Sequence, residues 1–352
     1  MGSTGVAARF NVIMTSPRLA DPAVELLHRA GCAIHYMEPF PSADAVAELT
    51  GAIQADAILT RQGPVNAAAM AASARLKVVA RHGVGIDDVD LAAAAAGGIV
   101  VARAPGSNTQ AVAEHTLAMM LALAKDLHTL SASLAAGGWR GAATKVRDIA
   151  GMRLGIIGYG AIGQTVARLA LAFGMRVQVF GGSGEPTQPG VMRAGSLDAL
   201  LAVSDALTLH CPLTPATRNL IGAAALSRLP AGAIVINTAR GGIVDEAALL
   251  AAIDAGHIAG AALDVFAIEP PPAGDMLRHH PRIIRTPHVS GVTDGALVNM
   301  GVMAAECIAA VLTGGVVPPE RLVSWVPPER LVSWVPPERL VPGVSPDRLV
   351  RG

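Results

Sequence analysis

Three segments in the second half of the chain each carry one ionisable residue suited to catalysis, namely Arg240 in NTARGGIVDE, Glu269 in ALDVFAIEP and His288 in TPHVSG. The planar and permanently charged guanidinium of arginine holds a carboxylate in a two-pronged contact. Histidine exchanges protons near neutral pH, and a glutamate on its second ring nitrogen fixes the tautomer and favours the protonated ring. The three residues therefore predict a site that holds an organic acid and exchanges a proton with it.

Each of the three residues also has an ordinary structural explanation. Arg240 could form a surface ion pair, and Glu269 and His288 could be loop residues beside prolines. All three segments, however, lie at the ends of expected strands, where open α/β sheets bind their ligands. The joint pattern favours catalysis.

A glycine-rich turn, LGIIGYGAIG, lies between an expected strand and an expected helix. In such a turn the first glycine, Gly158, permits a tight bend, the second, Gly160, lets the backbone approach a pyrophosphate, and the third, Gly163, allows close helix packing. The backbone N–H groups of Ala161 and Ile162 would then face the phosphates. The triplet alone could be only a tight turn, but with its flanking elements it predicts bound NAD or NADP.

The second strand after this turn ends in VQVFGGSG, which puts Gly181 where dinucleotide sites usually carry an Asp or Glu. The missing carboxylate removes a partner for the ribose hydroxyls of NAD and also a repulsive charge against the 2′-phosphate of NADP. Ser183 could donate to that phosphate, and no arginine follows before Arg193. We expect dual or NADP-leaning cofactor use.

The elements that must position these residues alternate between short strands and helices, which predicts mostly parallel sheets covered on both faces. A long amphipathic helix is expected over 108–127 and another over 293–312. Strands are expected at 11–15, 33–36, 57–60, 78–81 and 99–101 in a first unit, and at 154–157, 176–180, 206–209, 233–237, 260–264 and 283–286 in a second.

The composition excludes several kinds of partner. The chain has 352 residues, 52% of them hydrophobic, which is enough for two soluble domains. Its 27 basic and 27 acidic residues give no general attraction to nucleic acid or to a membrane surface. The three cysteines show neither disulfide nor metal spacing, and no export signal or membrane span is expected. A cytoplasmic protein with a small-molecule partner and no metal is the resulting prediction.

Residues 317–352 consist of a nine-residue repeat, VPPERLVSW and its variants. Paired prolines at that period cannot form a continuous helix or a central strand. We expect a disordered tail that arose by duplication of a short coding segment, with a docking or oligomerisation arm as the alternative.

The glycine turn and the three segments after it, in this order within about Asn11 to Val317, resemble the D-2-hydroxyacid dehydrogenase family. The resemblance implies an α/β fold with two Rossmann-like, doubly wound parallel-sheet domains. A flavodoxin-like substrate domain would comprise 1–104 and 290–316, and an inserted NAD(P)-binding Rossmann domain would comprise 105–289. It also implies hydride transfer between C4 of the nicotinamide and C2 of a small 2-keto or 2-hydroxy acid, in the cleft between the domains.

The resemblance assigns further residues by motif. Val84 and Gly85 in RHGVGIDDVD match the substrate loop whose backbone amides bind the carboxylate, and Arg61 in LTRQG matches a neighbouring substrate-side loop. The family varies at His82, and packing in the core or at an interface is the expected role of His115. The matching cofactor contacts are Gly158, Gly160, Ala161, Ile162, Gly163, Gly181, Pro212, Thr238, Ala239, Asp264 and Gly291, with Asp264 at the nicotinamide carboxamide.

Members of this family are usually dimers paired through the coenzyme domain, so a homodimer is expected. The expected substrate is glyoxylate, hydroxypyruvate or a phosphoglycerate-like acid. The alternative function is a cofactor-sensing, corepressor-like interaction protein, although a pure sensor has no need of Arg240, Glu269 and His288 together.

Overall fold

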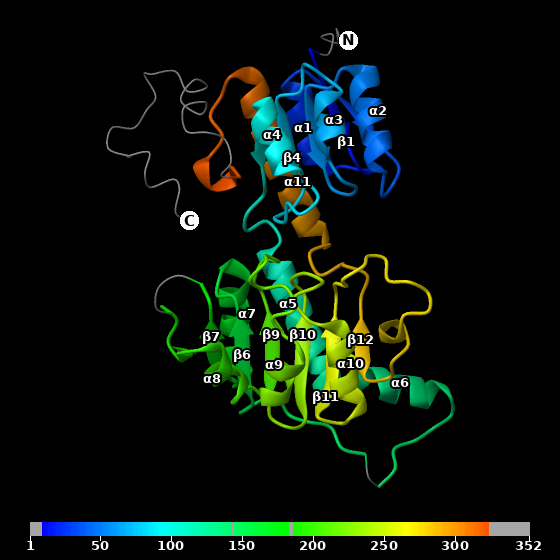
Figure 1. Cartoon of the computed structure of the whole chain (residues 1–352), viewed down its shortest axis with the longest axis vertical. Coiled ribbons are helices and arrows are strands. Elements are labelled where there is room, and N and C mark those ends of the chain that lie inside the picture. The colour runs from blue at the N-terminus through cyan, green and yellow to red at the C-terminus, as the bar shows by residue number, and fades with distance from the viewer. Residues whose placement is uncertain (1–8, 143, 183–185, 324–352) are drawn as a thin grey trace, which may run out of the picture. The chain divides into compact units, whose positions relative to one another are not determined.

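The computed structural model describes residues 9–142, 144–182 and 186–323. The chain divides into two compact units, one formed by Met1–Asn108 with Asp294–Gly352 and the other by Thr109–Thr293. The second unit is therefore inserted into the first. Figure 1 shows that each unit has its own sheet with helices packed on it.

The sheet of the first unit consists of β1 (Phe10–Met14), β2 (Cys32–Tyr36), β3 (Ala57–Thr60), β4 (Val78–Arg81) and β5 (Val100–Ala102). The strands are parallel and lie in the order β2-β1-β3-β4-β5. This is the flavodoxin-like, doubly wound order, so the predicted fold of this unit is confirmed.

The helices of the first unit are α1 (Asp21–Arg29), α2 (Ala43–Ile53), α3 (Ala67–Ala71), α4 (Leu91–Gly97) and α11 (Asp294–Thr313). Successive side chains of a strand point to opposite faces of the sheet, so β1 contributes to two cores. Val12 and Met14 pack with α1 and α11, whereas Ile13 packs with residues of α2, α3 and α4. Both faces of the sheet are thus covered.

Among the described residues, α11 is the one helix long and apolar enough to cross a membrane by length and composition. Half of its most apolar window is buried inside the protein. Ala304 and Ile308 of α11 share a core with Leu27 of α1 and Val78 of β4. The helix packs as a core element of the first unit.

The beginning of the repeat region differs from the prediction of a disordered tail. Val317 is buried, and a short 3₁₀ helix over Pro319–Arg321 follows it. Leu322 then forms an antiparallel bridge with Ala102 at the edge of β5. The prediction was wrong for 317–323, because an exposed strand edge offers backbone hydrogen bonds to a chain that passes beside it. The rest of the repeat, 324–352, lies outside the described residues.

The sheet of the second unit consists of β6 (Arg153–Ile157), β7 (Arg176–Phe180), β8 (Val191–Arg193), β9 (Ala206–Leu209), β10 (Ala233–Asn237), β11 (Ile258–Leu263) and β12 (Ile283–Arg285). The strands are parallel in the order β12-β11-β10-β9-β6-β7-β8. This is the dinucleotide-binding order with one added strand, which confirms the predicted Rossmann fold. The order reverses between β6 and β9, where such sheets bind their ligand. The sequence prediction missed β8.

The helices of the second unit are α5 (Thr109–Ala124), α6 (Leu127–Ala135), α7 (Ala161–Ala172), α8 (Leu197–Leu201), α9 (Ala223–Arg228) and α10 (Glu246–Asp254), with a 3₁₀ turn at Met276–Arg278. α5 and α7 cover one face of the sheet, and α8, α9 and α10 cover the other. The single helix predicted over 108–127 ends earlier, because Asp126 has a φ of +48° and separates α5 from α6.

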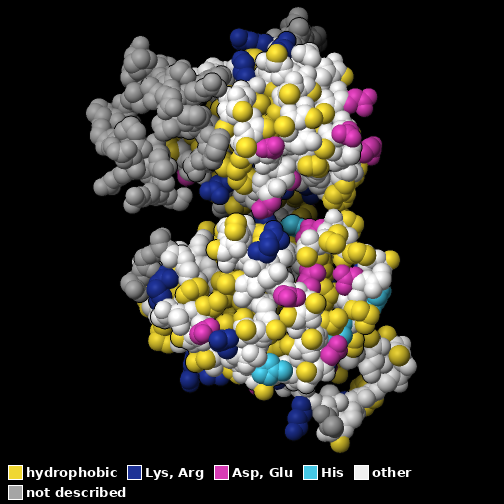
Figure 2. Space-filling view, viewed as in Figure 1, with side chains coloured by type: hydrophobic (Ala, Val, Ile, Leu, Met, Phe, Trp, Pro, Cys, Tyr) yellow, Lys and Arg dark blue, Asp and Glu magenta, His cyan; other side chains and the backbone are white. Residues whose placement is uncertain are grey.

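Charged side chains are spread over both units. On the face shown in Figure 2, Lys and Arg side chains are scattered among Asp and Glu side chains, in keeping with a formal net charge of zero. Among the described residues, no group of three or more His, Cys, Asp or Glu side chains is placed to hold a metal ion.

Candidate active site

The glycine turn after β6 has no room for side chains at two of its three glycines. Gly158 has a φ of +94°, and a Cβ there would lie 2.5 Å from the carbonyl oxygen of His210. A Cβ on Gly163 would overlap the carbonyl oxygen of Gly158. A Cβ on Gly160, in contrast, would meet nothing within 4 Å. The first and third glycines are thus required by packing, and the second leaves space beside the backbone.

The helix that follows the turn begins without a side-chain cap. α7 starts at Ala161, and its N-cap Gly160 offers no side chain to the first N–H groups. Such a helix N-terminus attracts an anion through its free N–H groups and its dipole. The open side of Gly160 and the uncapped α7 fit a pyrophosphate, so these residues are suited to hold NAD or NADP.

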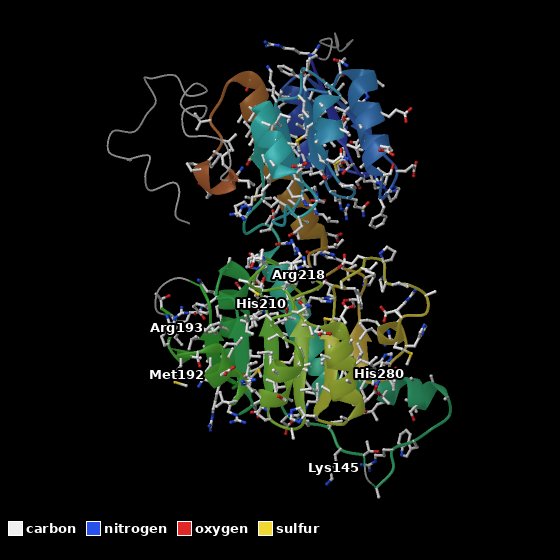
Figure 3. The ribbon with its side chains drawn as sticks, viewed as in Figure 1. Lys145, Met192, Arg193, His210, Arg218 and His280 are labelled. Atoms are coloured by element: carbon white, nitrogen blue, oxygen red, sulfur yellow. The ribbon has the colours of Figure 1, made fainter. Side chains whose placement is uncertain are left out.

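The guanidinium of Arg193 lies at the end of β7, where the acidic residue of most dinucleotide sites is absent. Gly181 follows β7 with a φ of +77°, and its carbonyl oxygen accepts a hydrogen bond from Nη1 of Arg193 at 3.1 Å. Arg193, labelled in Figure 3, lies on β8. In the sheet it pairs with Val179 of β7. The sequence places Arg193 twelve residues beyond Gly181, and only the pairing of β8 with β7 brings the two together.

His288 and Glu269 form the hydrogen-bonded pair that the sequence predicted. Nδ1 of His288 lies 2.6 Å from Oε2 of Glu269, whose Oε1 accepts the backbone N–H of Phe266 at 3.0 Å. Burial would raise the pKa of Glu269, but the hydrogen bond and the positive charges of His288 and Arg240 outweigh it, so the pKa is lowered. An ionised Glu269 requires Nδ1 of His288 to be the donor. This leaves Nε2 to exchange a proton with a substrate.

The turn that carries His288 is anchored on one buried carboxylate, that of Asp264. Its Oδ1 accepts the N–H of Val289 at 2.9 Å, and its Oδ2 accepts the N–H of Ser290 at 2.9 Å. The carbonyl oxygen of Asp264 accepts the N–H of His288 at 2.8 Å. His288 itself has a φ of +51°, which is uncommon for a residue other than glycine. The contact of Asp264 with a nicotinamide carboxamide stays a prediction. The hydrogen bonds between Asp264 and the His288 turn were not predicted from the sequence.

Arg240 lies in the turn after β10, which the side chain of Asn237 braces. Nδ2 of Asn237 donates to the carbonyl oxygen of Arg240 at 2.8 Å, and its Oδ1 accepts the N–H of Ala239 at 3.0 Å. A Cβ on Gly241 would overlap the carbonyl oxygen of Phe266, so this turn presses against the turn that leads to Glu269. The structure thus gathers the Arg240, Glu269 and His288 segments at the carboxyl ends of three adjacent strands.

The remaining predicted cofactor residues lie on loops at the same edge of the second sheet. Pro212 follows β9, Thr238 and Ala239 follow β10, and Gly291 follows the His288 turn. His210 and Arg218, labelled in Figure 3, flank Pro212 on its loop. The hydroxyl of Thr238 is buried and lies 2.9 Å from that of Thr116 on α5. Their contacts with a dinucleotide stay predictions.

The predicted substrate residues belong to the first unit. Arg61 follows β3, and Val84 and Gly85 follow β4, so both loops leave the carboxyl edge of that sheet. The backbone N–H of Arg61 donates to the Thr15 hydroxyl at 2.9 Å. Burial and the charge of Arg81 both lower the pKa of Arg61. The contact of Arg61, Val84 and Gly85 with a substrate stays a prediction.

His82, beside this loop, is predicted to make the stability of the fold dependent on pH. Burial lowers its pKa to about 4, and the charges of Arg61 and Arg81 act in the same direction. An unfolded histidine has a pKa of ~6.5, so between pH 6.5 and 4 the unfolded chain binds a proton that the folded chain refuses. This contribution to stability is therefore lost as pH falls through that window.

A His82→Asn variant should lose this dependence. The fall in the free energy of unfolding between pH 7 and pH 4 should be about 3 kcal/mol smaller in the variant than in the wild-type protein. Urea unfolding at a series of pH values measures it. If the free energy of unfolding fell equally with pH in both proteins, His82 would not take up a proton on unfolding.

Three supporting residues were not predicted from the sequence. They are Asn237, which braces the Arg240 turn, Thr286, which bonds Asp264, and Glu246, whose Oε1 accepts the N–H of Ala267 at 2.6 Å. Asn237 and Glu246 are the first and last residues of NTARGGIVDE, so their closeness to Arg240 in the sequence was a usable signal.

Comparison with known proteins assigns the chain to a family. Residues 117–290 match the NAD binding domain of D-isomer specific 2-hydroxyacid dehydrogenases, a stretch that contains the glycine turn, Arg240, Glu269 and His288. The chain belongs to the D-isomer specific 2-hydroxyacid dehydrogenase family. The resemblance seen in the sequence is thereby confirmed.

Individual known proteins match most of the chain. D-3-phosphoglycerate dehydrogenase of Mycobacterium tuberculosis is 41% identical over 268 residues, which are 75% of this chain and 51% of that protein. The TT0316 protein of Thermus thermophilus is similar in structure, with a TM-score of 0.80 and 35% identity over 89% of this chain and 99% of that one. A glyoxylate reductase from Paecilomyes thermophila has a TM-score of 0.79 and 27% identity over 90% and 98% of the two chains. The chain spans about half the length of the curated relatives it matches.

Proposed function

We propose that this member of the family is an NAD(P)-dependent D-2-hydroxyacid dehydrogenase that interconverts a small 2-keto acid and the corresponding 2-hydroxy acid. The observation that carries the proposal is the His288–Glu269 pair, at 2.6 Å, in the same sheet edge as Arg240 and the glycine turn. A proton donor, a carboxylate holder and a dinucleotide site are the groups that this reaction requires.

The residues divide the work as follows in the direction of reduction. A dinucleotide held at the glycine turn would supply the hydride that C2 of the keto acid receives. Arg240 holds the carboxylate of the substrate and polarises its carbonyl group. Nε2 of His288 gives its proton to the carbonyl oxygen, so the carbonyl carbon gains the hydride and the oxygen gains the proton. Glu269 keeps Nδ1 protonated and stabilises the charged ring before transfer.

The reaction is tested by following the absorbance of NADH and NADPH with a panel of 2-keto acids that includes glyoxylate, hydroxypyruvate and phosphohydroxypyruvate. Turnover with at least one of them supports the proposal. The similarity to a phosphoglycerate dehydrogenase and to a glyoxylate reductase supports including both phosphorylated and unphosphorylated acids. No turnover across the panel would favour the corepressor-like alternative, which needs the dinucleotide site but not the proton donor.

We also propose that the enzyme accepts NADP as well as NAD, or prefers it. Gly181, directly after β7, has no carboxylate that would repel a 2′-phosphate. The guanidinium of Arg193 on β8 reaches this end of β7, where it bonds the carbonyl oxygen of Gly181. An arginine close to this position is how related sites accommodate the phosphate. Kinetics that show a strong preference for NAD would overturn this part of the proposal.

Arg193→Gln is the corresponding prediction. We expect the KM for NADPH to rise by about 10- to 100-fold, the cost of losing a hydrogen bond to a charged group, while the KM for NADH changes by less than about two-fold. Arg176→Gln is a matched control, because Arg176 is exposed at the opposite end of β7. Equal changes for both cofactors would contradict the assignment.

A homodimer in the cytoplasm is proposed on more general grounds. Leu134 on α6 and Trp139 after it are exposed on the second unit, with exposed fractions of 59% and 80%, which favours a covering partner. Cys32, Cys211 and Cys307 are free thiols, which fits a reducing compartment. Sedimentation equilibrium at several concentrations tests the oligomeric state.

A further inference from the structure

His115 on α5 makes a contact that the proposed mechanism does not use. Its Nε2 lies 3.0 Å from the hydroxyl oxygen of Thr286, 171 positions later in the chain. Its neighbour Thr116 bonds the hydroxyl of Thr238 at 2.9 Å. Two adjacent residues of α5 thus reach two different turns at the carboxyl edge of the second sheet. The expectation that His115 only packs in a core or an interface does not account for this.

The direction of the hydrogen bond at His115 follows from its partners. The hydroxyl of Thr286 has one proton, which it donates to Oδ1 of Asp264 at 2.5 Å. A carboxylate can only accept, so this proton is committed. Nε2 of His115 must therefore carry a hydrogen and donate it to the Thr286 oxygen. The same Nε2 lies 3.8 Å from Oδ1 of Asp264, so His115 also faces the buried carboxylate.

The Asp264 carboxylate connects this contact to His288. Asp264 is fully buried, and its oxygens hold the N–H groups of Val289 and Ser290. His288 lies between Thr286 and these residues, with its left-handed φ of +51°. A residue in this conformation persists when the surrounding hydrogen bonds determine it. The position of the His288 ring thus depends on the bonds that hold Thr286 and Asp264.

We propose that His115 is a positioning residue for His288, acting through Thr286 and Asp264. Its Nε2–H fixes the Thr286 hydroxyl toward Asp264, and Asp264 in turn holds the backbone on both sides of the His288 side chain. The inference rests on the proposed function for its catalytic consequence, but its structural part concerns the free protein. A residue with only a packing role could be replaced by an apolar one of similar size without effect on His288.

The kinetic test compares His115→Leu with His115→Gln. Leucine removes the donor, whereas the amide of glutamine can donate from a position similar to that of Nε2. We expect kcat for keto-acid reduction to fall about tenfold in His115→Leu and to return to within about threefold of wild type in His115→Gln, with little change in the KM for the dinucleotide. His257→Leu is the control, because among the described contacts the side chain of His257 bonds only a backbone carbonyl, that of Leu226, at 3.1 Å.

A second readout needs no turnover. The imidazole signals of His288, followed by NMR across a pH series in protein labelled at histidine, report the setting of its ring. We expect the His288 titration curve to change in His115→Leu and to match wild type in His115→Gln and in the control. If the wild-type protein reduced no keto acid, the proposed function would fail and this comparison alone would decide the role of His115.

Two results would overturn the inference. One is a His115→Leu variant that melts at a lower temperature but keeps both kcat and the His288 titration curve of the wild-type protein, since that is a packing role. The other is a His115→Gln variant as impaired as His115→Leu, since the donor would then not be what matters.

Discussion

Replacement of His288 by alanine is expected to lower kcat by ~10²–10⁴, the usual contribution of a general acid or base. Nε2 of His288 is the one ring nitrogen that Glu269 leaves for the substrate, so alanine removes the proton donor without removing a residue of the glycine turn. Dinucleotide affinity, measured by fluorescence titration with NADH or NADPH, should stay within about two-fold of wild type.

His257→Ala serves as the control for this variant. His257 lies in the same unit and bonds the carbonyl of Leu226, away from the carboxyl edge of the sheet. It should keep wild-type turnover. Near-normal kcat in His288→Ala, with normal dinucleotide binding, would disprove the proposed acid–base role and leave Glu269 without a catalytic partner.

Replacement of Arg240 by lysine should lower kcat/KM for the keto acid by ~10²–10³, similar to the loss of one charge-stabilising donor in other active sites. Lysine keeps the positive charge but cannot make the two parallel hydrogen bonds of a guanidinium to a carboxylate. Nη1 of Arg240 donates to the carbonyl oxygen of Ala239 in the turn at 2.7 Å, and lysine would lose this bond. The turn should nevertheless survive, because the two hydrogen bonds of the Asn237 side chain reach backbone groups that lysine keeps.

Steady-state kinetics with the best substrate of the panel measure this change. Arg228→Lys is the matched control, since Arg228 pairs with Asp198 at 3.1 Å on the covering helices of the same unit. It should have no effect on kcat/KM. A loss in Arg240→Lys of less than about threefold would mean that a simple positive charge is enough, and that the two-pronged contact is not part of the mechanism.

The glycine turn and the segments of Arg240, Glu269 and His288 could be predicted from the sequence because each is a local pattern. Gly158, Gly160 and Gly163 occupy one turn, and packing and backbone geometry alone explain why the first and third must lack a side chain. The neighbouring strands β9, β10 and β11 are buried apolar runs of four to six residues, which are easy to recognise in a sequence. Leu207 of β9 and Val235 of β10, for example, lie in the core.

Short edge elements carry much less signal. β8 has only three residues, and Met192 at its centre is exposed, so neither length nor alternation marks it as a strand. Without β8, nothing in the sequence places Arg193 next to Gly181. The same limit applies to 317–323, where a bridge between Leu322 and Ala102 orders a segment that its prolines alone would leave extended.

Contacts between distant segments were also beyond prediction. Asp264 was assigned a role toward the cofactor from its motif, yet its carboxylate holds backbone groups at Val289 and Ser290. His115 meets Thr286 only because α5 packs on β10 and β11, next to the turn that follows β12. Such partners depend on the packing of whole elements and leave no pattern in a single stretch of sequence.

The insertion of the second unit also imposes an order on synthesis. α11, which completes one core of the first unit, lies beyond Thr293, whereas the strands and α1 that it covers precede Asn108. At the usual ~5–20 residues per second, a ribosome needs on the order of ten seconds or more to make the stretch from Thr109 to Thr293. During that interval one apolar face of the first sheet has no α11 to bury it. The unit that carries Arg240, Glu269 and His288 is contiguous, and it is therefore complete before the unit that begins the chain.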